Sequence, residues 1–187
     1  MTRQAIVSAA RTLFVQQGYF GTTVEDIAKA ARVSPATVYA VGRGKQGLLR
    51  TVIESGTSAP AVAQFYDRLA ALDDPDAVLR LITGATRMLF EEWSDLMRVV
   101  TATAPHDDSA AKSLEVARRS QRTGFTRTAE KLSELGALRE GIDTSEAVDI
   151  LWFHLGNAAY FTLTEDNHWS LDKAENWLYE SLRRALF

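Results

Sequence analysis

The sequence predicts an all-α protein of about nine helices, in which a short three-helix N-terminal domain precedes a larger helical domain. Apolar residues recur at helical spacing, three and four residues apart, along almost all of the 187 residues. The alternating runs of β-branched residues that are typical of strands are missing. Capping residues and glycines then divide the apolar pattern into separate helices.

The first two helices have clear boundaries. We expect the first at residues 3–17, because Gly18 is suited to end a helix. We expect Thr23 to cap a second helix at residues 24–31, with Asp26 at the reciprocal position of a capping box. A short turn is therefore predicted between these two helices.

A third short helix follows. Ser34 and Pro35 supply its N-cap and a proline in its first turn, and Gly42 and Gly44 end it. The pattern then predicts six further helices, most of them longer, at residues 46–55, 60–72, 76–104, 109–135, 144–164 and 170–186.

The composition excludes several classes of protein. The chain has no cysteine, so it has no thiol nucleophile, zinc knuckle or disulfide. Its most apolar stretch, residues 147–163, contains Asp149 and His154 and is shorter than the ~20 residues of a membrane span. The first ten residues lack the apolar block of a signal peptide. We therefore expect a cytoplasmic protein with no membrane partner.

Charge is distributed unevenly along the chain. The net charge is −3, but residues 1–55 carry seven basic and three acidic side chains, a net +4. The remaining 132 residues carry 14 basic and 21 acidic side chains, a net −7. Such asymmetry indicates an N-terminal part that faces a polyanion, attached to an acidic body.

Residues 23–39 have the pattern of a helix, a four-residue turn and a second helix. In a helix-turn-helix the first helix braces the second, whose N-terminal turns enter the major groove of DNA. Apolar Ile27 and Val38 would hold the helices together, while small exposed residues would let the second approach bases and phosphates. The residues expected to contact DNA are Thr22, Thr23, Ser34, Pro35, Ala36, Thr37, Tyr39, Ala40, Arg43 and Lys45.

Residues 5–52 resemble the DNA-binding domain of the TetR family of bacterial transcriptional regulators. The matching residues are Ala9, Ala10, Leu13, Phe14, Gly18, Tyr19, Thr22, Thr23, Ile27, Ala28, Val33, Ser34, Thr37, Tyr39, Lys45, Leu48 and Leu49. The resemblance implies a nine-helix fold that binds DNA as a homodimer. It places the DNA-binding domain at residues 1–45 and an effector-binding and dimerisation domain at residues 46–187.

Four residues depart from the usual family pattern. Arg32 replaces a glycine in the turn, Val41 a histidine or tyrosine, Gly42 a phenylalanine, and Gly44 a serine. The missing ring at position 42 is expected to leave a gap that another side chain fills, and Arg43 is expected to compensate for the absence of a phosphate-binding group at position 41. These departures leave open an alternative, a helical dimer that binds a ligand or partner but has lost specific DNA binding. The three helices could also be a packing unit that touches no nucleic acid.

The helix at residues 144–164 is apolar on nearly every side, so we expect it to face both its own core and a second chain. The helix at residues 170–186 adds an amphipathic stripe, and together they predict an isologous dimer interface. The interface residues expected are Phe161, Trp177, Leu178 and Leu182. The alternative is a monomer in which the first of these helices is simply central.

An effector site is predicted within the helical body. Gln121 and Thr128 interrupt the apolar face of the helix at residues 109–135, and a buried polar group without a partner costs about 1–3 kcal/mol. A ligand could be that partner; ordinary core packing, with these groups bonded to backbone or water, is the alternative. The residues expected to line the site are Met88, Trp93, Gln121, Phe125, Thr128, Trp152 and His154.

No constellation of residues indicates catalysis. The three histidines are too scattered for a metal pair, and the segment 106–108 is expected to be a solvated helix N-terminus rather than a ligand cluster. The segment 42–45 lacks the spacing and the preceding strand of a phosphate loop. We therefore expect no enzyme, cofactor or metal, but a regulator, acting as a repressor, that a small-molecule effector releases from double-stranded operator DNA.

Overall fold

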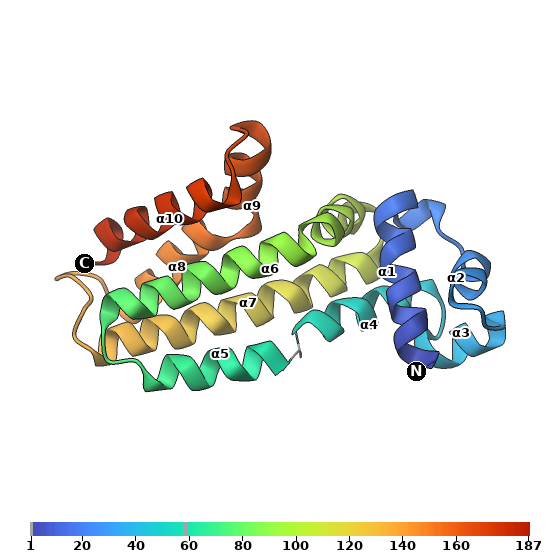
Figure 1. The fold of residues 1–187 in the computed structure, drawn as a ribbon, viewed down its shortest axis with the longest axis horizontal. Helices are drawn as coiled ribbons and strands as arrows, with labels where there is room; N and C mark the ends of the chain where they lie inside the picture. Colours follow the sequence, from blue (N-terminus) through green and yellow to red (C-terminus); the bar gives the residue numbers. More distant parts are fainter. Residues whose placement is uncertain (1, 58–59) are drawn as a thin grey trace. The chain divides into compact units, whose positions relative to one another are not determined.

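The computed structural model describes residues 2–57 and 60–187, and within these ranges the chain is helical with no strand (Figure 1). The chain forms two compact units. One contains the described residues up to 57 together with 95–119, and the other contains 60–94 and 120–187. The predicted boundary at residue 45 separates functions rather than compact units, so it stays a prediction.

The helices follow the predicted order. They are α1 (Thr2–Gly21), α2 (Val24–Ala31), α3 (Pro35–Gly42), α4 (Lys45–Thr57), α5 (Pro60–Ala71), α6 (Pro75–Thr103), α7 (Asp108–Glu134), α8 (Thr144–Leu155), α9 (Asn157–Phe161) and α10 (Leu171–Leu186). Most boundaries agree with the prediction within one or two residues, which is the usual uncertainty of a helix end. In α1 the predicted end at Gly18 appears as a break, because Gly18 leaves the helical conformation with φ 75° and ψ 164°.

The prediction of a single helix at residues 144–164 is wrong, because Gly156 divides this segment into α8 and α9. Gly156 has extended backbone, with φ −68° and ψ 156°. A Cβ atom at this position would lie 2.7 Å from the carbonyl oxygen of Trp152, so a larger residue would collide with the end of α8. After α9 the chain continues into a π-helical turn at Thr162–Asp166.

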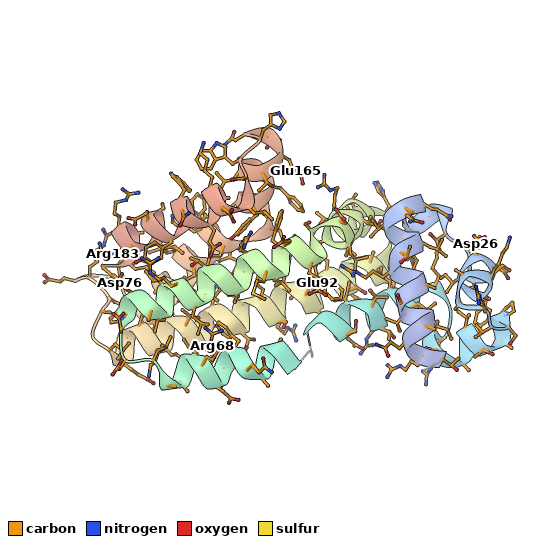
Figure 2. The ribbon with its side chains drawn as sticks, viewed as in Figure 1. Asp26, Arg68, Asp76, Glu92, Glu165 and Arg183 are labelled. Carbon is orange, nitrogen blue, oxygen red and sulfur yellow. The ribbon has the colours of Figure 1, made fainter. Side chains whose placement is uncertain are left out.

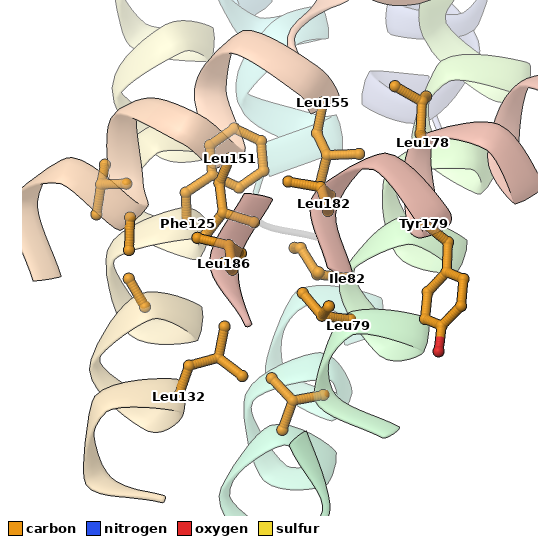
Figure 3. Close-up of a cluster of buried hydrophobic side chains, with 14 of the residues drawn as sticks. Leu79, Ile82, Phe125, Leu132, Leu151, Leu155, Leu178, Tyr179, Leu182 and Leu186 are labelled. Atoms are coloured by element: carbon orange, nitrogen blue, oxygen red, sulfur yellow. The ribbon is translucent and has the colours of Figure 1, made fainter. Parts of the chain in front are cut away.

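A large apolar core holds the second unit together (Figure 3). It is built from residues of α6, α7, α8 and α10, and fully burying one such side chain contributes about 1.5–3 kcal/mol. Its members include Leu79, Ile82, Phe125, Leu132, Leu151, Leu155, Leu178, Leu182 and Leu186.

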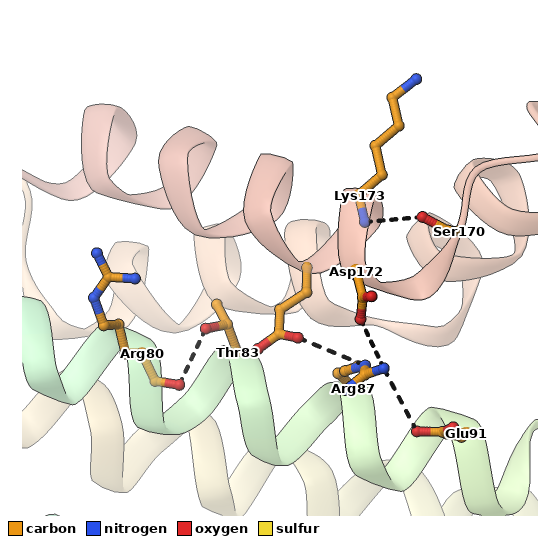
Figure 4. Close-up of polar contacts among 8 residues, drawn as sticks. Arg80, Thr83, Arg87, Glu91, Ser170, Asp172 and Lys173 are labelled. Atoms are coloured by element: carbon orange, nitrogen blue, oxygen red, sulfur yellow. Dashed lines mark hydrogen bonds and ion pairs between the residues drawn. The ribbon is translucent and has the colours of Figure 1, made fainter.

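Polar contacts add to the attachment of α10 to α6. Asp76 lies beside Arg183 (Figure 2) and accepts hydrogen bonds from Arg183 Nε at 2.9 Å and Tyr179 Oη at 3.0 Å. These two hydrogen bonds lower the pKa of the Asp76 carboxyl. Further along α6, Arg87 pairs with Asp172 at 2.8 Å (Figure 4). The core and these contacts together fix the position of α10 within its unit.

The described helices also differ from membrane spans. None of those at residues 2–57 and 60–187 combines the length and the apolar character needed to cross a bilayer.

Candidate nucleic-acid interface

The helix-turn-helix consists of α2 and α3, and both helices are capped as predicted. The Asp26 backbone N–H donates to Thr23 Oγ1 at 3.1 Å, and the Thr23 N–H donates to Asp26 Oδ2 at 3.1 Å. Hydrogen bonds from the Thr23 hydroxyl and backbone lower the pKa of Asp26. At α3, the Thr37 N–H donates to Ser34 Oγ at 3.2 Å. The local sequence therefore fixes where both helices begin.

The second helix of the motif, α3, has one buried face and one exposed face. Val38 is fully buried, as is Ile27 of α2. Pro35, Ala36 and Ala40 are exposed, and their small side chains leave the backbone of α3 open to close approach. These three exposed residues are among those predicted to contact DNA, and the contact itself stays a prediction.

Thr22 and Thr23, which were predicted to contact DNA, use their hydroxyl groups in hydrogen bonds within the chain. Thr22 is 1% exposed, and its hydroxyl donates to the carbonyl oxygens of Gly18 at 2.8 Å and Leu13 at 3.1 Å. This corrects the expectation that Thr22 reaches DNA, because it instead fixes the turn after α1. The Thr23 hydroxyl donates to Asp26 at 2.5 Å as part of the capping box.

Lys45 has partners that the sequence analysis did not predict. Its Nζ donates to the carbonyl oxygen of Tyr19 at 2.8 Å and lies 4.4 Å from the centre of the Tyr19 ring. Tyr19 is 3% exposed, and burial raises the pKa of its phenol to about 12. Lys45 therefore links the start of α4 to the end of α1. The sequence shows both residues, 26 positions apart, but no pattern in it indicates that they are in contact.

The space left by the missing ring at Gly42 is filled by another side chain, as predicted. A Cβ atom on Gly42 would lie 2.4 Å from Leu48 Cγ, so Leu48 of α4 already occupies this space. A Cβ atom on Gly47 would lie 1.7 Å from the carbonyl oxygen of Gly42. The two glycines thus let α3 and α4 approach more closely than larger residues would allow. A phenylalanine at position 42 would not fit this packing.

The end of α3 has a non-glycine residue in a left-handed conformation. Arg43 has φ 54°, and its backbone N–H donates to Tyr39 O at 2.8 Å. Both Arg43 and Tyr39 are exposed, Tyr39 to 52%. These side chains flank the exposed face of α3.

The N-terminal geometry agrees with a comparison to known proteins. Residues 6–52 match the family of bacterial regulatory proteins described as the tetR family. The chain is also 28% identical to the HTH-type transcriptional regulator YdeS of Bacillus subtilis, over 81% of this chain and 74% of that protein. This chain belongs to the TetR family. It is a transcriptional regulator of TetR type, and the relatives it matches are regulators rather than enzymes.

Solved structures share the fold of this TetR-family protein. The regulator FadR from Bacillus subtilis, in complex with stearoyl-CoA, has a TM-score of 0.81 at 16% identity, covering 98% of this chain and 99% of FadR. SmeT in complex with triclosan has a TM-score of 0.76 at 20% identity, covering 98% of this chain and 90% of SmeT. At these identities the likeness shows a common fold.

The polar groups expected to seek an effector already have partners in the TetR-family chain. Gln121 Nε2 donates to the carbonyl oxygen of Leu155 at 3.2 Å, and the Thr128 hydroxyl donates to that of Gly124 at 2.9 Å. This corrects the reason for expecting a ligand at these two residues, because the backbone satisfies both.

The other residues predicted to line the effector site differ in their contacts and exposure. His154 lies within hydrogen-bonding distance of the Ile150 carbonyl oxygen, at 2.8 Å, and of Ser181 Oγ, at 3.1 Å. Phe125 and Trp152 meet edge to face, Trp93 is half-buried, and Met88 is 68% exposed.

Tyr160 carries a buried polar group that the sequence analysis missed. It is fully buried, and no described residue provides a hydrogen-bond partner for its hydroxyl. Its ring stacks on Phe90 with centroids 4.8 Å apart. Burial raises the pKa of the Tyr160 phenol. Tyr160 lies within an apolar run of the sequence, and the sequence does not show whether its hydroxyl has a hydrogen-bond partner.

The residues predicted for the dimer interface fall into two groups. Leu178 and Leu182 are fully buried in the chain's own core (Figure 3), and half-buried Phe161 packs on Phe90. This corrects the assignment of Leu178 and Leu182, which are not available to a second chain, whereas half-buried Phe161 stays a predicted interface residue. Trp177 is 45% exposed, and Phe153 of α8, which the prediction omitted, is 77% exposed.

The described residues contain no group of three acidic or histidine side chains that could hold a metal ion. In the segment 106–108, Asp107 accepts a hydrogen bond from the Ala110 N–H at 2.8 Å and so caps the start of α7. Its position is that of a helix cap, as the sequence predicted.

Proposed function

We propose that this TetR-family protein binds operator DNA as a homodimer, represses transcription there, and is released by a small-molecule effector. The observation that carries the DNA-binding part is the exposed face of α3, formed by Pro35, Ala36 and Ala40, while Val38 of the same helix is buried. Small side chains on the exposed face of a recognition helix permit contact with base edges in the major groove.

Ala36 is a suitable position to test this proposal. We expect Ala36→Gln to change the preferred base at one position of each half-site, with a penalty of about 1–3 kcal/mol on the original sequence. The operator is first selected from a random pool of duplexes with the wild-type protein, and both proteins are then titrated against it.

The matched control is Ala30→Gln, the same exchange at an exposed residue of α2. We expect this control to keep the wild-type preference. If the Ala36 variant selected the same sequence as the wild type, α3 would not read the bases. If the wild-type protein bound all duplexes alike, the alternative without specific DNA binding would hold.

The proposed effector is a largely apolar molecule that carries a hydrogen-bonding group. The unpartnered Tyr160 hydroxyl beside the Phe90 ring supports this chemistry, because a buried hydroxyl gains about 1–3 kcal/mol by acquiring a partner. The ligands of the structural neighbours, stearoyl-CoA and triclosan, have this mixed character. The predicted lining residues belong to the same compact unit as Tyr160.

Binding of an effector and of operator must be reciprocal. We expect operator DNA to weaken the binding of a released effector by the same factor by which the effector weakens DNA binding. Stearoyl-CoA and triclosan are titrated calorimetrically with and without operator, against the wild type and Tyr160→Phe. A compound that binds equally in both titrations is not an effector, and equal binding to the Tyr160→Phe variant would remove Tyr160 from the site.

A further inference from the structure

Two arginines flank the recognition helix, and both occupy a backbone conformation that favours glycine. Arg32 lies in the turn before α3 with φ 55°, and Arg43 directly follows α3 with φ 54°. Besides these two, His168 is the only non-glycine residue with a positive φ in the ranges 2–57 and 60–187. Left-handed positions at helix ends are usually filled by glycine because a Cβ atom is unfavourable there. The chain therefore has a long cationic side chain at each end of α3 where local backbone preference favours glycine.

Both side chains are exposed and available. Within the described part of the chain, neither guanidinium makes an ion pair or a side-chain hydrogen bond. Other arginines of the protein differ in this respect. Arg50, for example, pairs with Glu54 at 2.6 Å. Folding therefore gives no evident reason for a guanidinium at either position.

The length of α3 matches the groove it would enter. Its eight residues span about 12 Å at 1.5 Å per residue, and the major groove of B-DNA is about 12 Å wide. Because the helix is no longer than the groove is wide, a long side chain at either end can extend to a phosphate at the edge of the groove. An arginine at each end is then placed to meet a phosphate, which it can bind through two hydrogen bonds.

We propose that Arg32 and Arg43 form a clamp that holds the phosphates on the two sides of the major groove while α3 reads the bases between them. The clamp adds Arg32 to the residues expected to contact DNA. It also gives a function to one departure from the family pattern, the arginine in the turn. The inference rests on the proposed DNA-binding function.

The test measures how DNA binding depends on salt. The variants are Arg32→Gly and Arg43→Gly, with Arg32→Asn as a second replacement that tolerates a positive φ. Each removes one cation while retaining a residue suited to the backbone, so we expect the folded structure to be kept, as checked by thermal unfolding. The control is Arg50→Ala, which removes an arginine that already has an acidic partner.

We expect each clamp variant to lower the slope of log K against log salt concentration by about one. Affinity should fall about tenfold, as for the loss of one charged hydrogen-bonding contact, on the selected operator and on unrelated duplexes alike. Arg50→Ala should leave the slope unchanged.

Two results would overturn the clamp while leaving the proposed DNA binding intact. Wild-type binding with an unchanged slope in Arg32→Gly and Arg32→Asn would exclude Arg32, and a changed base preference would mean that the arginine contacts bases rather than phosphates. If the wild type bound no duplex at any salt concentration, the proposed function would fail and the clamp with it.

Discussion

Replacing Gly47 with alanine is expected to lower the free energy of unfolding of the compact unit that contains α3 and α4 by about 3 kcal/mol. This is the upper end of the usual cost of overpacking. The added Cβ atom would lie 1.7 Å from the carbonyl oxygen of Gly42 and 2.9 Å from its carbonyl carbon. Both atoms belong to the backbone at the end of α3, so no side-chain rotation can relieve the collision. Either α4 must move away from α3 or the end of α3 must unwind.

Alanine substitutions at two other glycines test whether the collision causes the destabilisation. Gly42→Ala should cost less, because its Cβ would meet mainly the side chain of Leu48, at 2.4 Å. Gly124→Ala in α7 is the matched control, since a Cβ there would meet nothing within 4 Å, and alanine should stabilise a helix interior by about 1 kcal/mol. Denaturant unfolding, followed by circular dichroism, measures all three. Equal effects of the Gly47 and Gly124 substitutions would contradict the close approach of α3 and α4.

The beginnings of the helices were predictable because they depend on neighbouring residues. Thr23 and Asp26 are three positions apart, and their reciprocal hydrogen bonds follow from that spacing alone. Ser34 and Pro35 define the start of α3 in the same way. The helix-turn-helix could therefore be located, and its exposed and buried faces assigned, from the sequence.

Contacts between helices were less predictable, because apolar spacing shows that a face is buried but not what covers it. The stripe of α10 that contains Leu178 and Leu182 was assigned to a second chain, whereas it packs in the chain's own core. Periodicity also does not show where a polar atom bonds. It placed Thr128 on an apolar face but could not reveal that its hydroxyl bonds the backbone one turn earlier.

The close approach of Gly42 and Gly47 illustrates a third limit. Each glycine was visible in the sequence, and another side chain was expected to fill the space left by the missing ring at position 42, but the sequence did not show which one. Only the path of α4 shows that Leu48 and the backbone near Gly47 occupy it. The sequence therefore shows that a neighbouring group must fill the space, but not which helix supplies that group.

We expect aspartate at Phe153 or Trp177 to dissociate the proposed homodimer without unfolding the chain. Phe153 of α8 and Trp177 of α10 are 77% and 45% exposed. They belong to neighbouring parts of one surface, because His154 approaches Ser181 at 3.1 Å and Ser181 lies one turn after Trp177. In an isologous interface every substitution acts twice, and each large apolar side chain left unburied forfeits about 1.5–3 kcal/mol.

Sedimentation should therefore show a monomer for Phe153→Asp and for Trp177→Asp, and a dimer for the wild type and for Met88→Asp. Met88 is a matched control, because it is 68% exposed but lies on α6. Loss of the dimer should lower operator affinity by about 100-fold or more. The second half-site is bound from a high effective concentration only when the two chains are joined. Arg32 and Arg43 remain intact in these variants, so the affinity for a single half-site should be kept. A wild-type monomer, or dissociation by Met88→Asp to the same extent, would contradict an interface formed by α8 and α10.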